Sequence, residues 1–195
     1  MPNRTPVLTP DLIQIVKIFL GTALGLVLVF SLFDAYRANN TGKGRSFQVA
    51  DADRLFFLNL RSIHYDREVR LEAGMEIYRH GKRSKSDTVF TFFPALLLHS
   101  KQQEAYLFFE LERAEYPLQI QINRGDQIDQ IPFDLGGNAA HKTLGEQLWP
   151  LLQQDASFSL LVRDKEIPLW QTESEKEVLK TVLTDYFRLL NQPQP

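Results

Sequence analysis

No cysteine occurs among the 195 residues of the chain, which excludes disulfide bonds, thiolate metal ligands and cysteine nucleophiles. The absence does not select a compartment, because many proteins of oxidising spaces also lack disulfides. The four histidines are scattered, at His64, His80, His99 and His141, and none has the spacing from another that metal ligands usually have on one element. We therefore expect no metal site and no cofactor.

Motifs that accompany common enzymatic chemistry are also missing. There is no phosphate-binding glycine loop, no GxGxxG, no GxSxG and no HExxH. The glycine-rich turn "DLGGN" is typical of a plain loop entering a helix, and "HYD" at His64–Asp66 has no nucleophile motif beside it. An enzyme would need active groups that converge only in three dimensions. We expect a protein that is not an enzyme.

Positive charge is scarce in most of the chain. The sequence has 22 basic and 24 acidic residues, of which residues 1–45 hold five and two, so the remainder carries a net charge of −5. A surface of that sign disfavours general nucleic-acid binding, which relies on basic groups to neutralise phosphates. We expect no nucleic-acid partner.

A long apolar run opens the chain. Residues 12–33 are apolar and broken only by Gln14 and Lys17. As a helix, this run is long enough to cross a hydrocarbon core of about 30 Å, and the stem of Lys17 can carry its ammonium group to the lipid headgroups. The run predicts one transmembrane helix, with membrane lipids as its partner and a single-pass location for the protein.

Two other interpretations of this run are less favoured. A cleaved signal peptide needs small residues one and three positions before the cut, and a cut after Ala35 would put Phe33 at one of them. A helix buried in a soluble core would show a polar face with a helical period, and the run has none. We expect an uncleaved anchor with the following domain outside the cytoplasm, although the count of basic residues leans slightly the other way.

Gly21 and Gly25 form a small-xxx-small pair within the run. Such a pair lets another helix approach closely because neither residue has a side chain to hold the backbones apart. The pair predicts packing against other membrane subunits, although glycine is also simply common in membrane helices.

Short strands follow. "EVRLEAGMEIYRHG" alternates apolar and polar residues as one half-buried strand, and "EAYLFFELER" and "PLQIQIN" alternate again. "TVFTFFPALLLHS" is apolar on both faces as a central strand is, but Pro94 within it would suit a bulge or an edge strand. Together they predict an antiparallel meander. The earlier stretch "RLFFLNLRSIHYD" is ambiguous, and Phe56, Leu58 and Leu60 at a period of two favour a strand there.

The pattern then changes to helices. "HKTLGEQLWPLLQQ" has leucines at helical spacing, with Thr143 and Glu146 placed as a capping box, and "SFSLLVRDKEIPLW" predicts a hairpin. A final amphipathic helix begins at one of two overlapping capping boxes, Thr172 with Glu175 or Ser174 with Glu177. The fold class predicted is α+β, a mainly antiparallel sheet with two late helices packed on it. The predicted parts are a tail (1–11), the transmembrane helix (12–33), a linker (34–46), the α+β domain (47–190) and a flexible tail (191–195).

Four basic residues gather at a predicted hairpin tip, "RHGKRSK". Arg79, Lys82, Arg83 and Lys85 could bind anionic lipid headgroups or an acidic partner, or form an ordinary solvated turn.

Two functions fit these features. The first is a single-span membrane-anchored interaction module, an accessory or structural subunit of a membrane protein complex. The alternative is a membrane-tethered binding domain for a lipid or other apolar small molecule, with Phe90, Phe92, Tyr106 and Phe108 lining its pocket.

Overall fold

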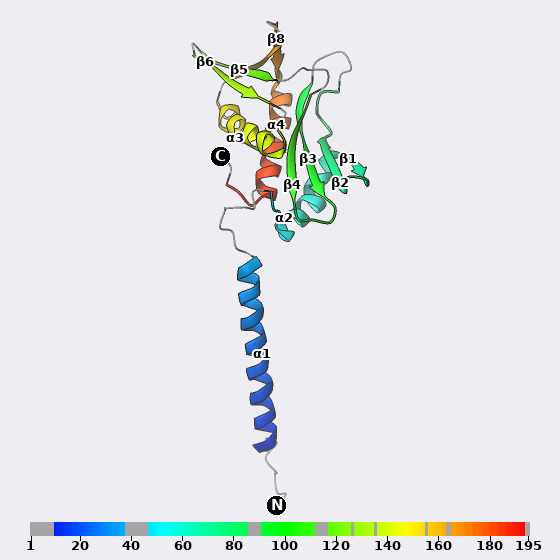
Figure 1. Cartoon of the computed structure of the whole chain (residues 1–195), viewed down its shortest axis with the longest axis vertical. Helices are drawn as coiled ribbons and strands as arrows, with labels where there is room; N and C mark the ends of the chain where they lie inside the picture. The colour runs from blue at the N-terminus through cyan, green and yellow to red at the C-terminus, as the bar shows by residue number, and fades with distance from the viewer. Residues whose placement is uncertain are drawn as a thin grey trace, which may run out of the picture. The chain divides into compact units, whose positions relative to one another are not determined.

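The computed structural model describes residues 10–37, 47–85, 91–111, 117–125, 127–134, 136–154, 156–162 and 165–193, with only the backbone described at Pro10 and in residues 28–37. The chain forms two compact units, residues 1–45 and residues 46–195 (Figure 1).

The first unit contains helix α1, Pro10–Arg37, which is 28 residues long. The Thr22 hydroxyl donates a hydrogen bond to the Ile18 carbonyl oxygen at 2.8 Å, one turn back along the helix. Within the part of the chain that the structure describes, no helix is long and apolar enough to cross a membrane. The exposed large apolar side chains of α1 are those of Leu12, Ile13, Ile15, Val16, Ile18, Phe19, Leu20, Leu24, Leu26 and Val27.

The second unit confirms the α+β class. Its elements are α2 (Asp51–Phe56), the π-helical η1 (Phe57–Arg61), the 3₁₀-helical η2 (Ser62–His64), β1 (Tyr65–Arg70), β2 (Met75–His80), β3 (Phe92–His99), β4 (Ala105–Leu111), β5 (Leu118–Arg124), β6 (Gln127–Phe133), α3 (Asn138–Leu152), β7 (Ser157–Val162), β8 (Lys165–Leu169) and α4 (Glu173–Leu189).

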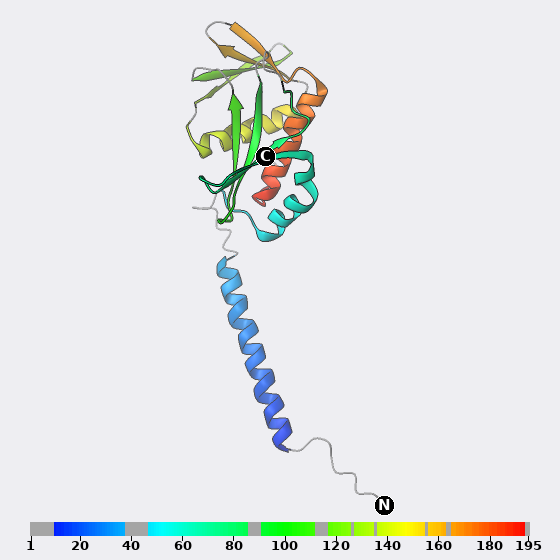
Figure 2. The same ribbon diagram turned by 90° about the vertical axis from the view of Figure 1, so that its right-hand side faces the viewer.

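The strands form two four-stranded antiparallel sheets rather than the single sheet that was predicted. The first has the order β1-β2-β3-β4 and is a meander, whereas the second has the order β6-β5-β7-β8 and lies at one end of the first (Figures 1 and 2). β4 and β5 follow one another in the sequence but belong to different sheets, because β5 pairs with β6 and β7. Alternation alone shows which residues share a face, and it does not show which strands pair.

Strand β3 lies inside the first sheet, as its two apolar faces predicted. Pro94 fits there because the pairing of β3 with β2 ends at Ala95 opposite Arg79. The missing N–H of Pro94 therefore falls one position beyond the last pair with β2.

Two predictions about the first half of the domain are wrong. Residues 51–64 are helical and not a strand, as α2, η1 and η2 follow one another without a break. The alternating run that was predicted as one strand is a hairpin, β1 and β2, which reverses at residues 71–74 with Gly74 at a φ of 62°. Leu71 consequently lies in a turn and is exposed instead of facing the core.

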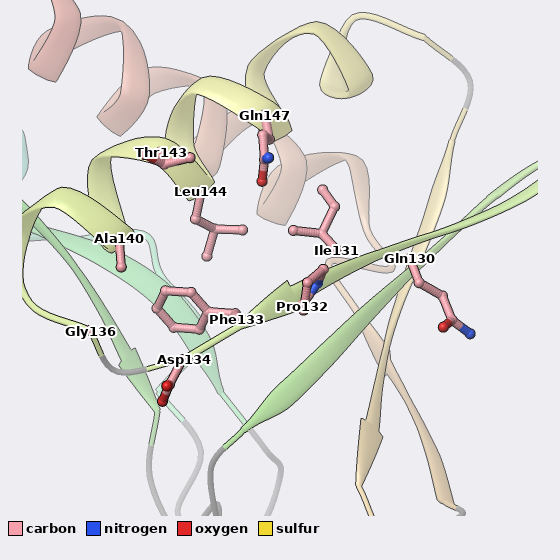
Figure 3. Close-up of a pocket in the computed structure, with 10 residues that line it drawn as sticks. All are labelled: Gln130, Ile131, Pro132, Phe133, Asp134, Gly136, Ala140, Thr143, Leu144 and Gln147. Atoms are coloured by element: carbon pink, nitrogen blue, oxygen red, sulfur yellow. The ribbon is translucent and has the colours of Figure 1, made fainter.

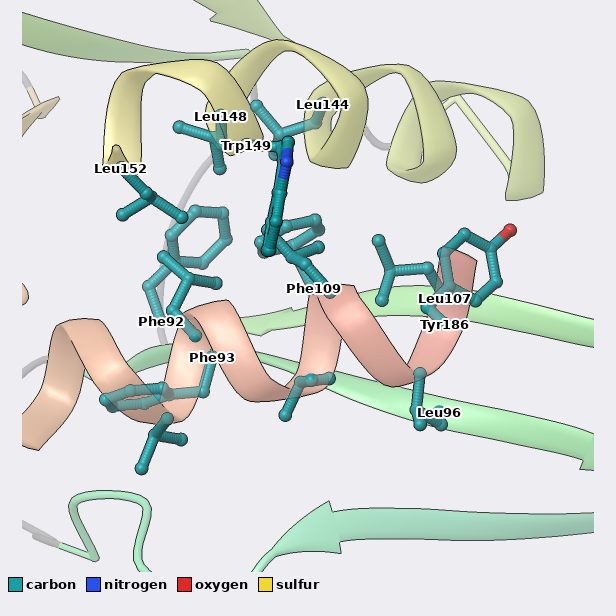
Figure 4. Close-up of a cluster of buried hydrophobic side chains, with 14 of the residues drawn as sticks. Phe92, Phe93, Leu96, Leu107, Phe109, Leu144, Leu148, Trp149, Leu152 and Tyr186 are labelled. Carbon is teal, nitrogen blue, oxygen red and sulfur yellow. The ribbon is translucent and has the colours of Figure 1, made fainter. Parts of the chain in front are cut away.

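Helix α4 runs along β3 and β4, and α3 lies beside β4 (Figures 2 and 4). The α3 backbone comes close to β4 at Gly145, where a Cβ atom would stand 2.7 Å from Leu107 Cδ2 and 3.1 Å from Leu183 Cδ2. The leucines and aromatic rings of the two helices and the first sheet form one buried cluster between them (Figure 4). The two late helices predicted from the sequence are therefore present and help to form the core.

One of the helix caps predicted from the sequence is present in the structure, and another is absent. Thr172 caps α4 as predicted, because its side chain accepts from the Glu175 N–H and the Glu175 side chain accepts from the Thr172 N–H. The capping box predicted at Thr143 is wrong, since α3 begins at Asn138 and places Thr143 inside the helix. The N-cap is Gly137, whose φ of 82° suits a residue without a side chain.

Trp170 joins the two sheets. Its indole N–H donates to the Phe92 carbonyl oxygen at 2.7 Å, and its ring lies 5.8 Å from the Phe92 ring and 5.3 Å from the Phe158 ring. Phe92 belongs to the first sheet and Phe158 to the second, so both sheets contribute to one core.

Candidate functional site

The outer edge of β4 is capped by groups from two other segments. Ala105 N–H donates to the Phe47 carbonyl oxygen at 3.0 Å, and Phe109 N–H donates to His141 Nδ1 at 3.0 Å. An outer strand presents unpaired N–H groups that can pair with another chain. These two bonds therefore remove part of the edge that β4 would otherwise offer.

His141 is 1% exposed and sits among aromatic rings, with Phe108 at 4.3 Å and Phe133 at 5.1 Å. Burial lowers the pKa of the His141 imidazole to about 4. Because Nδ1 accepts a hydrogen bond, the neutral ring carries its proton on Nε2, and this buried atom has no hydrogen-bond partner among the described residues. Nothing in the sequence distinguishes His141 from any other histidine near a helix start.

A second buried polar cluster joins α4 to the start of the domain. Asp185, 4% exposed, accepts from Arg61 Nε at 2.8 Å and from the Tyr65 hydroxyl at 2.7 Å. Burial and the neighbouring Asp185 charge raise the pKa of the Tyr65 phenol, and burial lowers the pKa of His80, whose ring lies 5.2 Å from that of Tyr65. Both carboxylate oxygens are used within the domain, which indicates that the cluster holds elements together.

The predicted basic tip begins with Arg79 in β2, continues after the strand, and is largely ion-paired. Arg83 and Lys85 both contact Asp66, at 2.7 and 2.9 Å, and these two cations lower the pKa of that carboxyl to about 2. Lys82 is exposed.

The remaining basic residue, Arg79, is paired across the first sheet. Its guanidinium lies 2.6 Å from Glu110 of β4 and 2.5 Å from Glu68 of β1. Three of the four basic charges therefore already have acidic partners in the domain, which leaves little of the local positive charge uncompensated.

Among the residues predicted to line an apolar pocket, the three that the structure describes do not converge. Phe90 lies outside the described residues. Phe92 is buried in the core against Phe109, with ring centres 5.2 Å apart. Tyr106 and Phe108 alternate with the core-facing residues of β4, and the Tyr106 hydroxyl bonds to Glu104. Phe92 and this pair thus lie on opposite faces of the first sheet.

A groove of about 380 Å³ lies elsewhere, between β6 and α3. β6 is an outer strand of the second sheet. Figure 3 shows Ile131, Phe133 and Leu144 gathered between the strand and the helix, with Gln130 pointing away from them. The sequence did not indicate this groove because it arises where two separate segments pack. Its lining residues are Gln130, Ile131, Pro132, Phe133, Asp134, Gly136, Ala140, Thr143, Leu144 and Gln147.

Gly21 and Gly25 of α1 have open space beside them. A Cβ atom built on either residue would meet no atom within 4 Å in the described part of the chain. Neither glycine therefore places a side chain between α1 and a helix that approaches it on this face.

In the described ranges, no group of three or more His, Asp or Glu side chains is placed to hold a metal ion. No family model, no curated protein and no solved structure matches the chain.

Proposed function

We propose that the protein is a membrane-anchored interaction module, with residues 12–33 crossing the bilayer once and the α+β unit serving as a subunit of a larger membrane assembly. The observation that carries this proposal is the exposure of the large apolar side chains of α1 from Leu12 to Val27. Water around so many apolar groups is unfavourable, and hydrocarbon removes that cost. The sequence continues the apolar run from 28 to Phe33.

The polar groups within this helix suit the same environment. A run of 22 residues is about 33 Å long as a helix, close to the ~30 Å of a hydrocarbon core. Lys17 lies near the start of the run, where its ammonium can reach the headgroups. The Thr22 hydroxyl is satisfied by the Ile18 carbonyl, so it needs no water.

The glycine pair supports association with other subunits. Because Gly21 and Gly25 leave the helix surface open, a second helix can pack with its backbone close to theirs. The domain lies outside the cytoplasm in this proposal.

The test begins with tagged full-length protein in its native membranes. Extraction with alkaline carbonate should leave it in the membrane pellet, and gentle detergent should release it with partner proteins in a fixed ratio, identified by sizing and mass spectrometry. Gly21→Leu with Gly25→Leu should lower that ratio, whereas the control Ala23→Leu, on another side of the helix, should not. Release by carbonate would refute the anchor, and an unchanged ratio in the double variant would refute the glycine face.

The groove between β6 and α3 favours a second candidate, a membrane-tethered binding domain for an apolar small molecule. Its volume of about 380 Å³ is in the range of ligand sites, and Ile131, Phe133 and Leu144 give it an apolar wall. Native mass spectrometry of the purified full chain should then show a bound small molecule. Ala140→Trp, which fills the groove, should abolish it, and the neighbouring exposed Ala139→Trp should retain it. A ligand-free wild-type protein would oppose this candidate.

A further inference from the structure

The helical segment 51–64 carries large aliphatic side chains on its outer side. Leu55 is 58% exposed, Leu60 is 57% exposed and Ile63 is 75% exposed. The opposite side of the same segment is buried, since Phe57 is 1% exposed and packs 5.2 Å from the Tyr78 ring. The segment thus buries Phe57 in the core and exposes three large aliphatic side chains, beside the polar Asn59 and His64.

Two contacts attach the helical segment to α4. Arg61 is held by Asp185 at 2.8 Å, and the Arg188 guanidinium lies 3.5 Å from the centre of the Phe56 ring. These two contacts hold the middle of the segment against α4, and Leu55, Leu60 and Ile63 remain exposed around them.

We propose that this outer face lies in the membrane–water interface of the bilayer that holds α1. The inference rests on the proposed membrane anchor and extends it by assigning the side of the domain that meets the lipid. Amphipathic helices bind such interfaces by burying aliphatic side chains at the headgroup boundary.

The length of chain between the two units supports this occupant. Helix α1 ends at Arg37, and the domain is fixed again at Phe47, whose carbonyl oxygen accepts from Ala105 N–H. The nine residues between them span at most about 34 Å when fully extended. Helix α2 begins at Asp51, only four residues after Phe47, so this tether is short enough for the start of the segment to reach a membrane surface that α1 crosses.

The net charge of residues 51–64 indicates which forces would bind the segment to lipid. Residues 51–64 contain two acidic residues, Asp51 and Asp53, and two basic ones, Arg54 and Arg61. With no net charge, the segment is neither attracted to nor repelled by anionic headgroups. Its contact with lipid therefore depends on the aliphatic side chains and is insensitive to salt, unlike that of a polybasic surface.

The absence of cysteine permits a direct test with single spin labels on the full chain. Cysteine is introduced at Leu55, at Ile63, at Leu20 of α1 and, as a matched exposed control, at Ile128 of β6, which is 65% exposed. Each labelled protein is placed in phosphatidylcholine nanodiscs at one chain per disc. Collisions with oxygen and with a water-soluble nickel chelate then report whether each label lies in lipid or in water.

The labels at 55 and 63 should favour oxygen over nickel by at least a few-fold relative to the label at 128, in low and in high salt. If the label at 20 favours oxygen while those at 55 and 63 behave like that at 128, the anchor stands and this inference fails. If 55 and 63 are shielded from both reagents, protein covers the face, and the inference also fails. If the label at 20 favours nickel, the anchor fails and the inference with it.

Discussion

Helices α1 and α4 differ in how their apolar residues are arranged. α1 has 28 residues, and its described large apolar side chains are exposed over most of its circumference, beside the face that carries Gly21 and Gly25. α4 has 17 residues, and its apolar side chains form one stripe that is buried against the first sheet, while Ser174, Glu177 and Arg188 remain exposed. The shorter and less apolar helix is the one with a core to pack on.

The difference shows that the angular distribution of apolar residues decides which surroundings can cover a helix. A sheet covers one side of a helix, which suits the stripe of α4. A sheet cannot cover a helix whose apolar residues surround most of its axis. Such a helix needs lipid hydrocarbon or several other helices around it. The apolar side chains of α4 are buried by the domain itself, whereas burial of those of α1 requires lipid or another protein.

The strongest way to break the comparison is to place an arginine in each helix. Leu183→Arg buries an unpaired charge at a site that is 0% exposed and should unfold the domain, seen as loss of the near-ultraviolet circular dichroism signal. Leu24→Arg should leave the domain's unfolding midpoint unchanged but release the protein from membranes. A shifted midpoint in Leu24→Arg would show that α1 contributes to the domain's stability.

The next effect concerns the one acidic residue that α4 buries. Asp185→Ala leaves the Tyr65 hydroxyl and Arg61 without their acceptor, and we expect the domain to lose about 3–5 kcal/mol in urea unfolding. Tyr65→Phe removes one hydrogen bond only and should cost about 1 kcal/mol. Equal effects of the two variants would show that the pair with Arg61 contributes nothing.

Acid should act on the domain through His141. The folded state holds this imidazole neutral with a pKa of about 4, so the unfolded chain takes up the proton first as the pH falls below about 6.5. This contribution is complete above pH 6.5 and falls by about 3 kcal/mol on reaching pH 4.

Two substitutions of His141 distinguish the effect of its protonation on stability from the effect of its hydrogen bond with Phe109 N–H. The amide side chain introduced by His141→Asn keeps an acceptor for Phe109 N–H and should flatten the dependence between pH 6.5 and 4. His141→Leu removes the acceptor and should cost about 1–3 kcal/mol at pH 7. Urea unfolding at several pH values measures both effects. An unchanged pH dependence in His141→Asn would assign the loss to other groups.

The smallest expected change in stability comes from replacing a glycine in each of the two units. Gly145→Ala pushes a methyl group against Leu107 and Leu183 and should destabilise the domain by about 1–2 kcal/mol. Gly21→Ala meets open space and should leave the domain's stability unchanged. Thermal unfolding of the two variants beside the wild type measures this, and a loss of domain stability in Gly21→Ala would contradict the separation of the units.

Elements with an undisturbed period were the predictable ones. The alternation of β4 and the stripe and cap of α4 are present in the structure as predicted. Residues 51–64 were not predictable in this way, because the π-helical turn of η1 changes the helical period midway. Phe56, Leu58 and Leu60 then resemble an alternating strand by coincidence, while the buried residue is Phe57.

The buried polar contacts could not be predicted because their partners are far apart in the sequence. Asp185 lies 120 residues from Tyr65, and His141 lies 32 residues from Phe109. No local pattern reports that such residues meet, and the same holds for the groove, which needs β6 and α3 packed side by side. Local sequence thus predicted the elements, and their packing created the polar clusters and the groove.

The way the chain enters the domain also has a mechanical consequence. Residues 47–49 are bonded to strand β4 and the turn before it, through Ala105 N–H to the Phe47 carbonyl oxygen and Val49 N–H to the Gln103 carbonyl oxygen. Tension applied through residues 1–45 is therefore carried by the first sheet before it reaches α2. A moderate force on the N-terminal side therefore acts first on these two backbone hydrogen bonds. Helix α2 experiences that force only after the two bonds have broken.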